Sequence, residues 1–223
     1  MDLNQNKKNI ENAVAAACLE AKRSPESVKV IAVTKYVDIA ATRQALSTGI
    51  RHIGENRADK FLEKYQVLND DDVVWHFIGT LQRRKVKDVI NLVDYFHALD
   101  SVKLAREIDK RAEHTIKCFL QVNVSGEESK HGFSTTEVTS VLEELQELKH
   151  IELVGLMTMA PFDADDKQLQ EIFSKTESLR CQLASLKLPN MPLTELSMGM
   201  TRDYPIAIKN GATFVRVGTA FFE

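Results

Sequence analysis

The sequence has few cysteines and no long apolar run. Cys18, Cys118 and Cys181 are odd in number and far apart, which argues against a disulfide framework or a zinc site and indicates buried thiols in a reducing cytoplasm. Nowhere do about 18 apolar residues follow one another, so we expect no membrane span. The polar N-terminus argues against a signal peptide. We therefore predict a cytoplasmic protein.

The sequence also lacks an excess of charge of either sign. Its 29 Lys and Arg residues and 32 Asp and Glu residues give a net charge of -3. Because the two signs are interspersed, no electrostatic feature favours binding to nucleic acid. The 223 residues are 43% hydrophobic and contain no low-complexity segment or long linker. This composition fits one globular domain over residues 1–223.

Short apolar runs alternate with helical patterns along the chain. Helices are expected between the runs, and one more, over 10–18, precedes the first run. This alternation predicts an α/β fold with a parallel sheet, namely a single (β/α)8 TIM barrel with an extra N-terminal helix. A doubly wound open sheet is the alternative. The expected strands lie at 28–34, 51–54, 74–79, 95–99, 117–124, 153–159, 195–198 and 213–217. The expected helices lie at 38–48, 57–68, 84–92, 102–111, 138–148, 169–186 and 201–210.

Lys35 follows directly on the first expected strand. In a barrel the chemistry lies at the carboxyl ends of the strands, and a lysine there is rarely buried without a partner or a role. A neutral lysine amine attacks a carbonyl and forms a Schiff base. The alternative is a lysine whose stem packs while its ammonium reaches solvent.

The last two expected strands end in small residues, Ser197-Met198-Gly199 and Gly218-Thr219. Loops after strands seven and eight of a barrel commonly hold a phosphate. A helix beginning at Thr201 would add favourable partial charge. Each glycine alone is explained as a turn residue, but the pair at adjacent strand ends predicts a phosphate site.

Arg216 interrupts the otherwise apolar last strand. A buried guanidinium stays charged and needs an acceptor, which is either a core carboxylate such as Glu55 or Glu195, or a ligand.

A lysine and a phosphate site in one barrel fit two kinds of protein. One is an aldolase acting on a sugar phosphate, and the other is a protein that binds pyridoxal 5'-phosphate (PLP).

Three histidines, His52, His76 and His97, lie on or beside expected strands. They lack the H-x-H or H-x-x-x-H spacing of a barrel metal site. We therefore interpret them as core residues and predict no metal site.

Seven motifs, in order along the chain, resemble those of the pyridoxal phosphate homeostasis protein family. They are V-I-A-V-T-K-Y at 30–36, I-G-E-N-R at 53–57, W-H-F-I-G-T-L-Q at 75–82, S-G-E-E-S-K-H-G-F at 125–133, G-L-M-T-M-A-P at 155–161, S-M-G-M-T-R-D at 197–203 and V-R-V-G-T at 215–219. The resemblance implies a barrel of the alanine-racemase-like type, PLP fold-type III, without the C-terminal β domain. It implies PLP held as a Schiff base on Lys35.

The resemblance also implies the other cofactor contacts. Asn56 would lie beside the cofactor, and Arg216 would face its pyridine nitrogen or its phosphate. Apart from the resemblance, Lys130 in the loop after the fifth expected strand is interpreted as part of a solvated turn, with a second amine for incoming PLP as the alternative. The residues that would hold the phosphate are Ser197, Gly199, Gly218 and Thr219.

The resemblance implies a monomer that buffers PLP or delivers it to apo PLP-dependent enzymes. An arginine at the pyridine nitrogen weakens the cofactor as an electron sink, and racemisation also needs a second acid/base group. Alanine racemases take that group from an additional domain, for which the predicted barrel leaves no residues. We therefore predict a PLP carrier with little or no turnover. A PLP-dependent amino-acid racemase and a Schiff-base aldolase are the alternatives.

Overall fold

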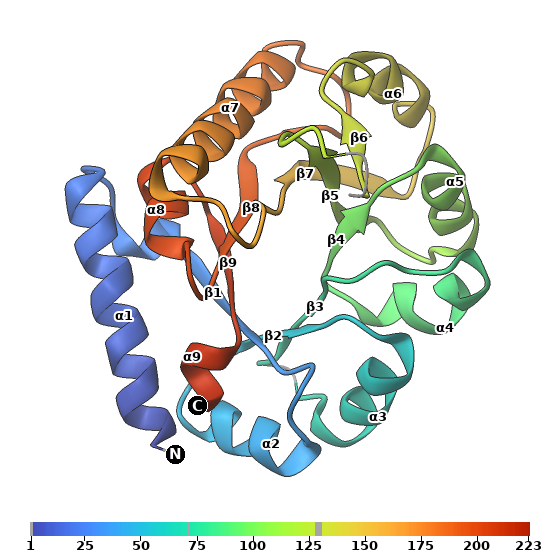
Figure 1. The fold of residues 1–223 in the computed structure, drawn as a ribbon. Coiled ribbons are helices and arrows are strands. Elements are labelled where there is room, and N and C mark those ends of the chain that lie inside the picture. Colours follow the sequence, from blue (N-terminus) through green and yellow to red (C-terminus); the bar gives the residue numbers. More distant parts are fainter. Residues whose placement is uncertain (1, 71, 128–130) are drawn as a thin grey trace.

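The computed structural model describes residues 2–70, 72–127 and 131–223 and forms a closed barrel of parallel strands (Figure 1). Around the barrel the strands follow the order β4-β3-β2-β1-β9-β8-β7-β5, and β5 pairs with β4 to close it. The predicted (β/α)8 barrel is confirmed, and the open-sheet alternative is wrong. Lys130, the second candidate amine, lies outside the described residues. The strands are β1 (Lys29–Val33), β2 (His52–Glu55), β3 (Val74–Phe77), β4 (Tyr95–Leu99), β5 (Ile116–Asn123), β7 (Ile151–Met157), β8 (Glu195–Met200) and β9 (Phe214–Val217).

Helices surround the barrel, and α1 lies outside the ring beside α8 and α9 (Figure 1). The apolar face of α1 is buried, which confirms the extra N-terminal helix. None of the described helices is long and apolar enough to cross a membrane. The helices are α1 (Leu3–Glu20), α2 (Ile39–Ser47), α3 (Ala58–Leu68), α4 (Val86–Val89), α5 (Val102–Arg111), α6 (Val138–Leu145), α7 (Asp166–Ala184), α8 (Tyr204–Lys209) and α9 (Thr219–Phe222).

Three elements differ from the prediction. The helix expected at 84–92 is α4 between two 3-10 turns, because a stretch rich in β-branched residues has low helix propensity. The helix expected from Thr201 begins only at Tyr204, where Pro205 occupies its first turn. A two-residue strand, β6 (Phe133–Ser134), pairs with the end of β5 and is too short to show a sequence pattern.

Aromatic and histidine rings fill the barrel interior. The Phe214 ring on β9 contacts the rings of Tyr95, His97 and Phe119 on β4 and β5. Since β9 is hydrogen-bonded to β1 and β8, these contacts cross the inside of the barrel. Arg216 lies two residues after Phe214 on the same face of β9, so its side chain also enters the interior.

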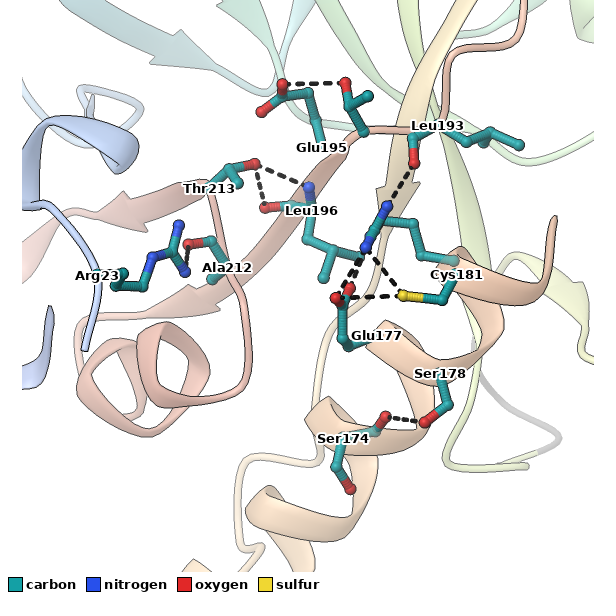
Figure 2. A network of polar contacts seen from close by, with 12 residues as sticks. Arg23, Ser174, Glu177, Ser178, Cys181, Leu193, Glu195, Leu196, Ala212 and Thr213 are labelled. Atoms are coloured by element: carbon teal, nitrogen blue, oxygen red, sulfur yellow. Dashed lines mark hydrogen bonds and ion pairs between the residues drawn. The ribbon is translucent and has the colours of Figure 1, made fainter. Parts of the chain in front are cut away.

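Polar contacts fix α7 and β9 to the beginning of β8 (Figure 2). Arg180 forms an ion pair with Glu177 on α7 and donates to the Leu193 carbonyl at 2.8 Å. The Thr213 hydroxyl accepts from the Leu196 amide at 2.8 Å. The two strands that carry the predicted phosphate site are thus held together at their amino ends.

The three cysteines are free, but they differ in exposure. Cys18 and Cys118 are buried, as predicted, and burial raises the pKa of the Cys118 thiol. Cys181 is exposed, so the prediction of a buried thiol is wrong there. Its thiol lies on the outer surface of α7 beside Glu177 (Figure 2).

Candidate functional site

Lys35 lies at the carboxyl end of β1 and is half-buried. Its ammonium is 4.7 Å from the centre of the exposed Tyr36 ring, a cation–π contact. β1 pairs with β2 on one side and β9 on the other. A Cβ atom placed on Gly218, just after β9, would lie 3.6 Å from Val33. Lys35 therefore follows a strand end that touches the predicted phosphate loop.

A buried ion pair anchors the segment that carries Lys35. The Lys64 side chain on α3 is 2% exposed, forms an ion pair with Glu55, and donates to the Thr34 carbonyl at 2.6 Å. The Thr34 hydroxyl donates to the same Glu55 oxygen. The sequence prediction missed Lys64, although the buried face of α3 gives a signal, because Lys64 takes a core position between Phe61 and Leu68.

We expect Lys64→Met to lower the free energy of unfolding by about 3–5 kcal/mol, because it leaves the Glu55 carboxylate buried without its cation. Urea denaturation measures the change. Lys60→Met is the matched control, since Lys60 pairs with Glu63 on the exposed side of the same helix and such pairs contribute roughly 0–1 kcal/mol. If the two substitutions lowered the free energy of unfolding equally, the stabilising role of the buried Lys64–Glu55 ion pair would be wrong.

A bulge in β8 shapes the predicted phosphate site. Ser197 pairs with Phe214 and Met200 with Arg216, so three steps along β8 match two along β9. Gly199 lies in the bulge at a φ of +94°, and a Cβ there would be 2.6 Å from the Ala207 Cβ atom. Only glycine suits this position, which brings β8 close to α8.

The loops after β8 and β9 are joined by a hydrogen bond. The Gly218 amide donates to the Thr201 hydroxyl at 3.1 Å, so Thr201 links the two loops rather than beginning a helix. Thr219 is exposed and begins α9. The structure therefore places Gly199 in the bulge near the end of β8, and Gly218 and Thr219 directly after β9, at the carboxyl end of the barrel.

Arg216 and Ser197 lie deeper in the barrel. Arg216 is 5% exposed and donates to the Ser197 hydroxyl at 2.7 Å and to the Thr158 carbonyl at 3.0 Å. Among the described residues, no carboxylate oxygen lies within 4.0 Å of its guanidinium nitrogens. The alternative of an ion pair with Glu55 or Glu195 is therefore wrong, since Glu55 pairs with Lys64 and the Glu195 carboxylate accepts from a neighbouring threonine.

The electrostatics around Arg216 are those of a buried and incompletely compensated cation. Burial lowers the pKa of Arg216 to about 10, and the nearby Asp203 carboxylate opposes this shift. Burial raises the pKa of Asp203, whose carboxylate accepts from the Met200 amide. Asp203 was not singled out in the sequence, although it closes the S-M-G-M-T-R-D motif.

The three histidines form a hydrogen-bonded chain, which we call the histidine relay (His52, His76 and His97). His52 Nδ1 lies 2.9 Å from His76 Nε2, and His76 Nδ1 lies 2.8 Å from His97 Nε2. His97 Nδ1 lies 2.8 Å from the Ser197 hydroxyl. Their interpretation as core residues is confirmed for His76 and His97, which are fully buried, whereas His52 is half-buried.

The buried histidines predict a loss of stability in acid. Burial lowers the pKa of His76 and of His97 well below the usual value of 6.5, so below pH 6.5 the unfolded chain binds protons that the folded protein does not. As the pH falls below 6.5, each histidine should lower the free energy of unfolding by up to about 1.4 kcal/mol per pH unit, and this effect should fade as the pH rises above 6.5.

The measurement is urea denaturation between pH 5 and pH 8. We expect His76→Gln to reduce the slope of the free energy of unfolding against pH, below pH 6.5, by the equivalent of about one proton. His114→Gln, at an exposed position, should leave this slope unchanged. A wild-type slope that His76→Gln does not alter would show that other groups cause the acid sensitivity.

Asn56 lines a cavity of about 400 Å³ at the ends of β2 and β3. Arg57, Thr80 and Gln82 also line this cavity, whereas Lys35 and the residues named on β8 and β9 are not among its lining residues. Lys35 thus follows the strand that pairs with β9, whereas Asn56 lines a separate cavity that neither Lys35 nor the named residues of β8 and β9 line.

The whole described chain is similar to known proteins. It matches the family described as "Alanine racemase, N-terminal domain" over residues 2–223. The "Pyridoxal phosphate homeostasis protein" of Aquifex aeolicus is 38% identical over 212 residues, which cover 94% of this chain and 92% of the relative. The protein of the same name from Escherichia coli (strain K12) is 31% identical over 227 residues, covering 99% and 96%.

Solved structures agree with these relatives. PipY of Synechococcus elongatus with PLP bound has a TM-score of 0.87 and 32% sequence identity, and the match covers 100% of both chains. Alanine racemase of Clostridium difficile 630 has a TM-score of 0.78 at 13% identity, which shows the fold alone. The match covers 99% of this chain but 56% of the racemase.

Proposed function

The chain belongs to the pyridoxal phosphate homeostasis protein family, and from this membership we propose that it binds PLP as a Schiff base on Lys35 and buffers or delivers it. The observation that carries the proposal is the position of Lys35. This half-buried amine follows β1, and the end of β1 pairs with the end of β9 directly before Gly218. An amine beside a loop suited to phosphate matches the aldehyde and the phosphate of PLP.

The residues present fit a phosphorylated pyridine aldehyde. Lys35 supplies the amine, and Gly199 near the end of β8 and Gly218 and Thr219 after β9 supply backbone for the phosphate. Arg216 supplies a buried cation whose recorded partners are neutral, which suits an anionic group or a ring nitrogen. PLP would bring the aldehyde that reacts with the amine. We propose Asn56 as a neighbour of the cofactor.

Ser197 has a different position from the other residues predicted for the phosphate. Its hydroxyl is fully buried and is hydrogen-bonded to His97 and Arg216. This geometry supports a role in holding Arg216 more than a direct contact with the phosphate.

An absorption spectrum of the purified protein mixed with PLP tests the function. We expect a visible Schiff-base band that borohydride removes, leaving a stable adduct. Mixing the loaded protein with an apo PLP-dependent enzyme should then restore that enzyme's activity. A protein that gives no band and transfers no PLP would contradict the proposal.

Relatives named for PLP homeostasis favour this function over the racemase alternative. We expect the PLP-loaded protein to show no racemase, transaminase or decarboxylase turnover above a slow background on common amino acids. If Arg216 faces the ring nitrogen, it weakens the cofactor as an electron sink, which is the reason for this expectation. Measurement of D-alanine formed from L-alanine checks this, and a turnover near the roughly 10 per second typical of enzymes would overturn the carrier function.

We further propose that the barrel acts as one domain and as a monomer in the cytoplasm. The free thiols of Cys18, Cys118 and Cys181 are compatible with a reducing compartment. The apo-enzymes that receive PLP are the proposed protein partners.

A further inference from the structure

The hydrogen bonds that run from Arg216 to His52 have a direction. A guanidinium only donates, so the Ser197 oxygen accepts from Arg216. The Ser197 hydroxyl must then donate its own hydrogen to another group. Among the described residues, its other hydrogen-bond partner is His97 Nδ1, which therefore accepts. His97 then carries its hydrogen on Nε2 and donates to His76 Nδ1, and His76 donates in the same way to His52. All three rings become neutral Nε2–H tautomers.

This direction matters for the charge on Arg216. Its recorded acceptors are a hydroxyl and the Thr158 carbonyl, both neutral, and Asp203 is the acidic group that acts on it from further away. At the other end of the relay, Lys29 and Asp94 act on His52 with opposite signs. A neutral, hydrogen-bonded support therefore holds the cation without cancelling its charge.

We propose that Ser197 and His97 are positioning residues, which fix Arg216 as a charged donor beneath the barrel mouth through the ordered histidine relay. The proposal rests on the proposed function, because PLP is the ligand that Arg216 would meet. In this proposal neither residue contacts the ligand. Each acts by fixing the direction in which the guanidinium points. Loss of either residue should therefore change the absorption spectrum of bound PLP.

The first test uses the ligand-free protein. Nitrogen-15 NMR of the histidine rings distinguishes the two tautomers. We expect His52, His76 and His97 to carry hydrogen on Nε2 and none on Nδ1 at pH 7.5. In Ser197→Ala we expect the His97 resonances to shift, because Nδ1 loses its donor. A His97 ring with hydrogen on Nδ1, or a doubly protonated ring, would overturn the ordered relay.

The second test uses the PLP-loaded protein. We expect Ser197→Ala and His97→Leu to weaken PLP binding roughly tenfold, the factor for one lost hydrogen bond to a charged group, and to shift the pH midpoint of the visible band. His97→Gln keeps a donor and an acceptor, so it should restore both quantities toward the wild-type values. The control is His150→Gln on the surface beside Asp109, which should leave both unchanged.

The outcomes separate this inference from the proposed function. If the wild type gives a visible band, and His97→Leu matches it in affinity and in pH midpoint, the positioning role is wrong. The positioning role is also wrong if His97→Gln loses as much PLP affinity, and shifts the pH midpoint as far, as His97→Leu. If the wild type gives no band, the proposed function fails, and the tautomers in the ligand-free protein decide the relay alone. Should His97→Leu not fold, Ser197→Ala gives the same comparison.

Discussion

Lys35→Ala should abolish the visible Schiff-base band while leaving the protein folded. The substitution removes the amine that we propose as the site of covalent attachment, and other cofactor contacts alone give no imine. The fold should survive because Lys35 is half-buried at a strand end and contributes little core area. Absorption spectra with and without PLP, together with thermal unfolding, measure both effects.

Peptide mapping after borohydride reduction identifies the modified residue directly. In the wild type the adduct should lie on Lys35. Lys29→Ala is the matched control, because Lys29 begins the same strand at the opposite end of the barrel and is exposed, so the band should persist there. An adduct found only on Lys130 or another lysine would contradict the assignment.

PLP should bind the wild-type protein at least a hundredfold more tightly than pyridoxal. Both compounds carry the aldehyde, so attachment to Lys35 is open to both, and the phosphate must supply the difference. Charge-assisted hydrogen bonds contribute roughly 1.5–3 kcal/mol each, so two or three of them give more than a hundredfold. Titration of the visible band with each compound measures the ratio.

Gly218→Val should remove most of this difference by blocking close approach of the phosphate to the backbone. A Cβ atom at Gly218 would lie 3.6 Å from Val33, an ordinary contact distance, so Gly218→Ala should be tolerated by the fold and show a smaller loss. The internal control is pyridoxal, whose reaction with Lys35 should be unchanged. Equal binding of PLP and pyridoxal to the wild type would mean that these loops hold no phosphate.

Arg216→Gln provides a comparison with the Gly218 variants. If the guanidinium faces the ring nitrogen, its loss should shift the cofactor's absorption more than Gly218→Val does. If it faces the phosphate, the two substitutions should instead reduce the preference for PLP in the same way.

The barrel and the position of its mouth could be predicted from local sequence patterns. Apolar runs of strand length and the helical periodicity between them fixed the order of the elements, and parallel strands place their carboxyl ends at one side. Lys35, Gly199 and Gly218 were found in this way, because each stands at or near the end of an apolar run. Their role in binding PLP stays a prediction.

The contacts behind the site could not be predicted, since they join residues that are far apart in the sequence. His52 and His76 are 24 residues apart, and His97 and Ser197 are 100 apart. Their hydrogen bonds depend on how far each strand is shifted along its neighbours, and no single motif encodes this. The helical pattern of α3 does place Lys64 on the buried face, but its ion pair with Glu55 depends on how α3 packs over the end of β2.

The buried Lys64 ammonium makes the turn that carries Lys35 part of a larger cooperative unit. The Thr34 carbonyl accepts from the Val37 amide, which closes the turn, and from Lys64 on α3. An opening of the turn that displaces the Thr34 carbonyl would leave the buried Lys64 ammonium without one of its two acceptors, so it should cost about 1–3 kcal/mol beyond the lost backbone hydrogen bond. Solvent exchange at the Val37 amide should then be faster in Lys64→Met than in the wild type. Lys35 would be held by a rigid part of the barrel, and the freedom needed to pass a cofactor on would belong to other loops of the mouth.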